Sequence, residues 1–251
     1  RPLTNPLIAH VHNLDQALPM LHAEIPTIVL DAFKALADKF WPGPLTMVVQ
    51  ANMDRVPSLV TAETGFVGLR MPKLEIARLL IKEAGVPLAA PSANKSGHVS
   101  PSTAQHVYDD FCQDPESEIT ILDGGNCSFG IESTVLKISA DDSGNLELLV
   151  LRQGGISLPQ LQGSVGADVV IKTKQHNEFK PETEKIEGPG QFLRHYAPNI
   201  DSYLYRGEEC DLSKAVLIDF GGNLLRQRDA CKHYIDLSAD GNVVEAIGNL
   251  Y

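Results

Sequence analysis

The sequence is short of positive charge. Its 251 residues include 21 lysines and arginines against 32 aspartates and glutamates, so the formal net charge is -11. A field of this sign does not attract a phosphate backbone, and the cationic residues are not interleaved with aromatic ones, which make up only 6% of the chain. We therefore expect any contact with RNA to be weak or local.

Cysteines are also few. The four cysteines are widely separated and form no CxxC pair, which argues against a zinc site or a redox motif. No apolar run approaches the roughly 20 residues of a membrane helix, and no segment has the charged, apolar and small-residue order of a signal peptide. These absences predict a reduced, cytoplasmic protein that does not bind membranes.

Several catalytic motifs are missing as well. The chain contains no GxxxxGK[ST], no GxGxxG, no HExxH and no recognisable serine, histidine and aspartate order. P-loop, dinucleotide-binding, metalloprotease and serine-protease interpretations therefore have no support.

What the chain does contain is a hydrophobic content of 43% and an alternation of strand-like and helix-like segments. Helical spacing occurs at residues 27–40, 75–84 and 103–111. Strand patterns occur at residues 6–11, 45–49, 66–71, 86–90, 119–122, 133–138 and 146–151. This order predicts an α/β fold with a mixed sheet and helices, spanning residues 1–172.

The composition changes near residue 173. Residues 173–199 are charged, polar and rich in proline and glycine, which predicts a linker. Beyond it, strand patterns at 201–205 and 215–220 and a helical pattern at 243–250 predict the start of a small α/β domain over residues 200–251. Because some 50 residues are few for an independent core, we expect this domain to be truncated.

The densest group of polar residues lies at 89–97, where a strand runs into a loop with Ala90, Ser92, Asn94 and Lys95. Hydroxyls and backbone N–H groups in such a loop can bind phosphate oxygens. An ordinary polar turn explains the same residues equally well.

Two arginines, Arg70 and Arg152, each end an apolar strand. Either can fork onto a carboxylate or a phosphate, or simply mark where the strand meets water. We expect the guanidinium of Arg152 to face a cavity and to contribute little to folding. His10 lies in an apolar run, where a core histidine is the usual case, and Ser133 follows a glycine-rich turn, where it can be a simple strand former.

Taken together, several motifs stand in one characteristic order. They are Arg1-Pro2-x-x-Asn5-Pro6-Leu7-Ile8-x-His10, Trp41-Pro42-Gly43-Pro44-Leu45-Thr46, Val67-Gly68-Leu69-Arg70-Met71-Pro72, Ala90-Pro91-Ser92-Ala93-Asn94-x-Ser96-Gly97, Ser100-Pro101, Asp123-Gly124-Gly125, Gly130-Ile131-Glu132-Ser133-Thr134-Val135 and Leu151-Arg152-x-Gly154. In this order they resemble the YrdC-like threonylcarbamoyl-AMP synthase family. Arg194-His195-Tyr196-Ala197-Pro198 resembles the interdomain linker of its two-domain members.

The resemblance implies an open, twisted α/β sheet with a large, concave, positively charged cavity. It also implies a nucleotidyltransferase that joins L-threonine, bicarbonate and ATP into threonylcarbamoyl-AMP and pyrophosphate, for the threonylcarbamoyladenosine modification of tRNA. Mg²⁺ is then the expected counter-ion of ATP, and a tRNA threonylcarbamoyl transferase complex is the expected downstream partner. No covalent protein nucleophile and no protein-held metal is implied.

The resemblance also assigns site residues. Those expected to contact ATP are Arg1, Asn5, Ser92, Asn94, Ser100, Arg152 and His195. Those expected to hold L-threonine are His10, Arg70, Ala90 and Ser133. Family members carry a Thr-Glu-Thr strand and a lysine before the position of Arg1, so we expect the chain to be N-terminally incomplete.

A catalytically inactive scaffold, favoured only by the expected N-terminal truncation, stays open from the sequence, as do two other functions. One is the carbamoyl-adenylate domain of hydrogenase maturation proteins, which uses carbamoyl phosphate; the His195-Tyr196-Ala197-Pro198 segment favours the synthase. The other is an RNA-binding module, which the net charge of -11 disfavours.

Overall fold

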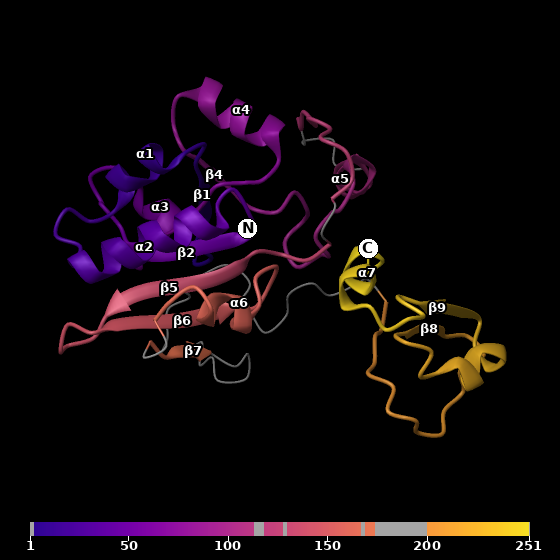
Figure 1. Ribbon diagram of the computed structural model, residues 1–251. Coiled ribbons are helices and arrows are strands. Elements are labelled where there is room, and N and C mark those ends of the chain that lie inside the picture. Colours follow the sequence, from indigo (N-terminus) through magenta and orange to yellow (C-terminus); the bar gives the residue numbers. More distant parts are fainter. Residues whose placement is uncertain (1–2, 113–117, 128–129, 167–168, 174–199, 251) are drawn as a thin grey trace. The chain divides into compact units, whose positions relative to one another are not determined.

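The computed structural model describes residues 3–112, 118–127, 130–166, 169–173 and 200–250 (Figure 1). The chain divides into two compact units, of which the first comprises Arg1–Gly97 and Glu132–Tyr196 and the second His98–Ile131 and Ala197–Tyr251. Residues 98–131 thus group with the C-terminal part, although they lie inside the expected domain 1–172. The expected boundaries stay a prediction, and all of the expected linker 173–199 except Thr173 lies outside the described residues.

The first unit is built on a seven-stranded mixed sheet with the order β4-β1-β3-β2-β5-β6-β7. Its strands are β1 (Ile8–His10), β2 (Leu45–Gln50), β3 (Phe66–Arg70), β4 (Leu88–Ala90), β5 (Thr134–Ala140), β6 (Leu146–Arg152) and β7 (Ile171–Thr173). The pairs β1–β3, β2–β5 and β6–β7 are parallel, and the other three are antiparallel. The predicted mixed α/β sheet is therefore confirmed.

The helices of this unit are α1 (Leu14–Ala17), the 3-10 turn η1 (Leu18–Met20), α2 (Thr27–Phe40), α3 (Ser58–Thr61), α4 (Glu75–Ala84) and α6 (Leu158–Gln162). The two long ones, α2 and α4, have the predicted bounds. Helix α4 ends at Gly85, whose φ of 70° is the left-handed conformation that glycine adopts without strain. The short α1, α3 and α6 were not predicted, because one helical turn carries no periodic pattern.

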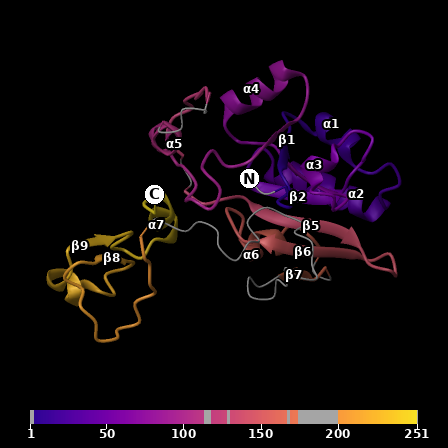
Figure 2. The same ribbon diagram turned by 180° about the vertical axis from the view of Figure 1, so that it is seen from behind.

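Helix α2 supplies one wall of the core. Its buried side chains are Val29, Phe33, Leu36 and Ala37, which share one helical face and pack against β2, β3, β5 and β6. Helix α2 lies beside β5, and both views draw the two elements next to each other (Figure 1, Figure 2). The helix stops at Trp41, whose ring meets that of Phe33 edge-on at 5.5 Å between centroids.

The two faces of the sheet differ. Alternate strand residues such as Met47, Val49 and Leu69 point into the main core, whereas their neighbours in sequence point the other way. The second face carries a small apolar cluster of Val48, Val135 and Leu151. Polar residues such as His10 lie on this second face. The face opposite the main core is therefore the one that can carry functional side chains.

The second unit contains α5 (Ala104–Phe111), β8 (Val216–Asp219), the 3-10 helix η3 (Leu225–Ala230), β9 (His233–Asp236) and α7 (Val243–Gly248). Strands β8 and β9 pair in parallel. Burial opposes ionisation of Asp219, but hydrogen bonds from Tyr234 and from the backbone N–H groups of the following turn outweigh it and lower its pKa. The predicted strand at 215–220 and helix at 243–250 are confirmed.

Two predicted strands are wrong. Residues 119–122 and 201–205 form no strand, and their large apolar side chains, including Leu122 and Tyr203, are exposed. A short apolar run satisfies a strand pattern in sequence but needs a partner strand to become one. Among the described residues, no helix is both long and apolar enough to cross a lipid bilayer.

The packing of α2 yields a first prediction. Phe33 is fully buried, so Phe33→Ala should lower the free energy of unfolding by about 3–5 kcal/mol through lost burial and a residual cavity. Thermal and urea melts measure this, with Leu59→Ala as the control because Leu59 is 58% exposed. Similar losses for both variants would show that α2 does not anchor the core.

Candidate active site

The candidate site lies at one edge of the sheet, where the ends of five strands meet. His10 ends β1 and Arg70 ends β3, and because these strands are parallel the two residues are direct partners. The antiparallel β2 begins beside the end of β3, and β5 begins beside β2. Strand β6 then returns antiparallel to β5 and ends at Arg152. Strand directions thus collect His10, Arg70, Thr46, Ser133 and Arg152 at one edge.

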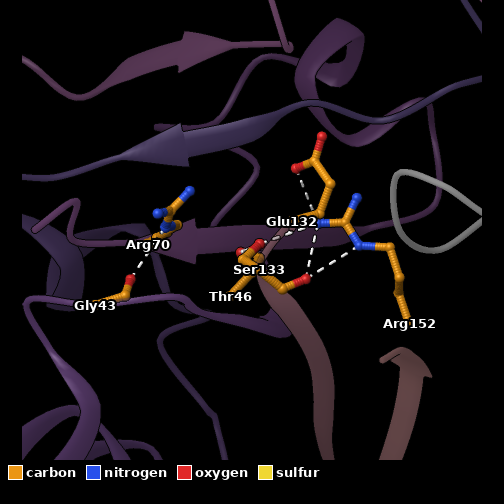
Figure 3. A network of polar contacts seen from close by, with 6 residues as sticks. All are labelled: Gly43, Thr46, Arg70, Glu132, Ser133 and Arg152. Carbon is orange, nitrogen blue, oxygen red and sulfur yellow. Dashed lines mark hydrogen bonds and ion pairs between the residues drawn. The ribbon is translucent and has the colours of Figure 1, made fainter. Parts of the chain in front are cut away.

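Arg70 is anchored through the turn that precedes β2. Its Nε donates to the Gly43 carbonyl oxygen at 3.1 Å (Figure 3). The Gly43 N–H in turn donates to the Met71 carbonyl oxygen at 2.9 Å. A side chain at Gly43 would overlap the Phe40 carbonyl oxygen, so only glycine fits the turn. The guanidinium of Arg70 is therefore held in place before any ligand arrives.

His10 is a neutral imidazole at neutral pH. Burial lowers its pKa most, the positive charge of Arg70 lowers it further, and the carbonyls of Leu88 and Ile8 offset this only in part, so the pKa is about 4. Its Nδ1 is buried and has no partner in hydrogen-bonding geometry among the described residues. A neutral ring nitrogen beside a fixed guanidinium can hydrogen-bond a polar ligand without repelling the arginine.

Ser133 is the meeting point of the other side chains. Its Oγ lies 2.8 Å from Thr46 Oγ1 and 3.0 Å from Arg152 Nη2 (Figure 3). The Ser133 carbonyl oxygen also accepts from Arg152, from Nη2 at 2.9 Å and from Nε at 3.1 Å. The Glu132 carboxylate lies 3.6 Å from Arg152 Nη2. Arg152 therefore ties the end of β6 to the residues that precede β5.

Close backbone packing fixes this arrangement. A side chain at Gly154 would overlap the carbonyl oxygen of Glu132 and the backbone of Ser133. The Gly155 N–H donates to the Glu132 carbonyl oxygen at 2.9 Å. The buried Thr134 hydroxyl donates to the Ile156 carbonyl oxygen at 2.7 Å and accepts from the Ile156 N–H at 2.9 Å. Residues 152–156 and 132–134 thus form one rigid unit.

The structure contradicts the solvent-facing Arg152 side chain on which the expected small contribution to folding was based, while the expected cavity contact stays a prediction. Its side chain is only 11% exposed and makes three hydrogen bonds to Ser133. Because Ser133 is distant in sequence, this contact could not be seen without the strand pairing. A role of Arg152 in ATP binding stays a prediction.

The loop after β4 lies toward the other end of β1. Strand β4 is antiparallel to β1, so Ala90 pairs with Ile8 rather than with His10. Ser92 and Asn94 follow in the loop, where the Asn94 N–H donates to the Ser92 carbonyl oxygen and Asn94 Nδ2 donates to the Lys95 carbonyl oxygen, both at 2.9 Å. The loop is thus internally braced, as a polar turn would also be.

Three residues predicted to contact ATP cannot be placed relative to the strand-end residues described above. Arg1 and His195 lie outside the described residues, and Ser100 belongs to the second unit. Asn5 precedes β1 and is 5% exposed, with an Oδ1 that has no hydrogen-bond partner among the described residues. A buried amide oxygen of this kind is a reasonable acceptor for a ligand N–H or O–H.

Taken residue by residue, the sequence offers no reason to expect a role in the site for Thr46, Glu132 or Gly43. All three lie inside the quoted motifs, and this was the one signal that could have found them. Within the described part of the chain, no three histidine, cysteine, aspartate or glutamate side chains gather as metal ligands.

The model of the Sua5_yciO_yrdC family, described as telomere recombination, matches residues 1–154. The chain belongs to this family. It is 38% identical over 82% of its length to the threonylcarbamoyl-AMP synthase of Schizosaccharomyces pombe. It is 37% and 39% identical over 82% of its length to those of Pyrococcus abyssi and Bacillus subtilis. The matches cover 53%, 56% and 55% of these relatives, so the chain spans about half of their length.

A solved structure of the same Sua5_yciO_yrdC family agrees with the fold. The crystal structure of P. abyssi Sua5 complexed with L-threonine matches with a TM-score of 0.72 and 30% sequence identity. The match covers 99% of this chain and 70% of the other. The sheet described above is therefore the family fold.

The buried bonds of Arg152 give a stability prediction. Arg152→Ala leaves the Ser133 carbonyl oxygen without its donors, so it should lower the free energy of unfolding by about 1.5–3 kcal/mol. Urea denaturation measures the loss. Lys172→Ala is the control because its ion pair with Glu147 is exposed, and it should leave the transition nearly unchanged. Equal transitions for Arg152→Ala and the parent protein would mean that Arg152 does not hold β6 to β5.

The low pKa of His10 gives a pH prediction. Its pKa is about 4 in the folded protein and about 6.5 when unfolded, so the unfolded chain binds more protons in this window. The stability contributed by neutral His10 is complete above pH 6.5 and is lost as the pH falls toward 4. His10→Gln should therefore flatten the dependence of melting temperature on pH between 7 and 4.5. Identical pH profiles for both proteins would contradict the burial of a neutral ring.

Proposed function

We propose that this chain carries the catalytic domain of an L-threonylcarbamoyladenylate synthase. The observation that carries the proposal is the pairing of neutral His10 with the anchored Arg70 at one sheet edge, in a fold shared with a protein crystallised with L-threonine. The relatives that match most of the chain are named threonylcarbamoyl-AMP synthases, which supports the same reaction.

The proposed threonine site uses complementary charge. The Arg70 guanidinium would bind the amino acid carboxylate, since a fixed fork of N–H donors matches two carboxylate oxygens. His10 would hydrogen-bond a polar group of the same ligand through its ring, and Ser133 would add a hydroxyl contact. Ala90, opposite Ile8 in β4, would contribute backbone to the pocket wall.

The proposed reaction needs alignment rather than a protein nucleophile. The threonine nitrogen first bonds the carbon of bicarbonate, with loss of water, to give a carbamate. A carbamate oxygen then bonds the α-phosphorus of ATP, and the bond from that phosphorus to the β-phosphate oxygen breaks to release pyrophosphate. Arg152 would stabilise the charge that develops on the phosphates, because a preorganised cation costs no reorganisation during the step.

The remaining ATP contacts would come from Asn5, Ser92, Asn94 and Ser100, together with Arg1 and His195. Because the described residues gather no metal-ligand cluster, we derive no step through Mg²⁺, and its role as counter-ion of the triphosphate stays a prediction. We further propose a cytoplasmic location, weak local contact with tRNA or double-stranded RNA, and a tRNA threonylcarbamoyl transferase complex as the consumer of the product.

A pyrophosphate-release assay tests the function. The protein should release pyrophosphate from ATP only when L-threonine and bicarbonate are both present, and carbamoyl phosphate should not replace them. Arg70→Gln should raise the KM for threonine roughly ten- to a hundredfold through loss of a charge-assisted bond. Arg55→Gln is the matched control, because Arg55 is an exposed arginine outside the site.

Two results would redirect the assignment. Equal turnover with carbamoyl phosphate in place of threonine and bicarbonate would favour the chemistry of hydrogenase maturation. Tight RNA binding at physiological salt without any pyrophosphate release would favour an RNA-binding module.

A further inference from the structure

Thr46 is a buried hydroxyl with a single partner. It lies on β2 with 0% of its surface exposed, and its Oγ1 is 2.8 Å from Ser133 Oγ. Among the described residues its hydroxyl makes no other hydrogen bond. A buried hydroxyl that carries one proton requires an acceptor for it, because an unmet buried donor is strongly unfavourable.

The partners of Ser133, together with the ligand contact that the proposed function gives it, decide which hydroxyl donates. Arg152 Nη2 can only donate, so it occupies one acceptor position of Ser133 Oγ at 3.0 Å. If Ser133 donated to Thr46, the Thr46 proton would be buried without an acceptor. If Thr46 donates to Ser133, that proton is satisfied and both acceptor positions of Ser133 Oγ are filled. The second arrangement moves the unmet proton to Ser133 and directs it away from Thr46 and Arg152, so it is favoured only when a bound oxygen accepts that proton.

We propose that Thr46 is a positioning residue that, together with Arg152, makes Ser133 an obligate hydrogen-bond donor toward an oxygen of the amino acid substrate. This inference rests on the proposed function. The expected acceptor is a carboxylate or carbonyl oxygen, because the filled oxygen of Ser133 can no longer accept from an amine or a hydroxyl. Ser133 is 2% exposed, so the ligand oxygen must lie directly against the sheet edge.

Strand pairing does not require the Thr46 hydroxyl. Strands β2 and β5 are already joined by a parallel register in which Thr46 pairs with Val135. The Thr134 N–H also donates to the Pro44 carbonyl oxygen at 2.9 Å just before this register. The side-chain contact is therefore additional to the backbone ladder, and it reaches the one serine that Arg152 also holds.

Steady-state kinetics of pyrophosphate release by the full chain test this role. Thr46→Val keeps the shape of the side chain but removes the donor, so the KM for L-threonine should rise about tenfold while the KM for ATP stays unchanged. Thr46→Ser keeps the donor and should behave like the parent protein. Thr46→Ala is measured beside them as a second donor-free variant, and each variant is melted to confirm folding.

A double-mutant cycle with Ser133→Ala completes the test. If Thr46 acts through Ser133, Thr46→Val should have no further effect on the threonine KM once Ser133 is alanine. An equal effect in both backgrounds, or no rescue by Thr46→Ser, would overturn the proposal. Failure of both donor-free variants to fold would also overturn it, by making the hydroxyl a folding requirement. Absence of threonine-dependent turnover in the parent protein would instead defeat the proposed function itself.

Discussion

The alternation of parallel and antiparallel neighbours in the seven-stranded sheet is the constraint on which the site depends. Because β1 and β3 are parallel and β2 is antiparallel to β3, two strand ends and one strand start fall at the same edge. The same argument places the start of β5 beside the end of β6. Residues separated by more than a hundred positions in sequence, such as His10 and Arg152, thereby share one edge.

The cations at this edge are held by backbone as much as by charge. Arg70 is fixed by the carbonyl of Gly43 and Arg152 by the carbonyl of Ser133. In both cases the accepting carbonyl lies next to a segment packed too closely for a side chain, at Gly43 itself and at Gly154. The two guanidinium groups are thus held in place by tight turns, because these turns put carbonyl oxygens within hydrogen-bonding distance of each arginine.

A structural feature could be predicted from the sequence when the residues that determine it are close together along the chain. Helix α2 could be predicted to the residue because its apolar spacing and its stop at Trp41-Pro42 are both local. Residues 119–122 and 201–205 satisfied the strand pattern yet remain unpaired, since pairing depends on a distant partner. Arg152 and Thr46 show the same limit in the site. Their roles follow from contact with Ser133, which no spacing along the chain could reveal.

The Trp41 ring has a consequence for how this protein can be observed. It is the only tryptophan in the chain, it is 7% exposed, and its Nε1–H donates to the Leu45 carbonyl oxygen at 2.8 Å. The segment between these residues contains Gly43, whose carbonyl holds Arg70. Tryptophan fluorescence therefore arises from one indole built into the turn beside the site. The molecule carries its own optical reporter of that turn, with no label to attach.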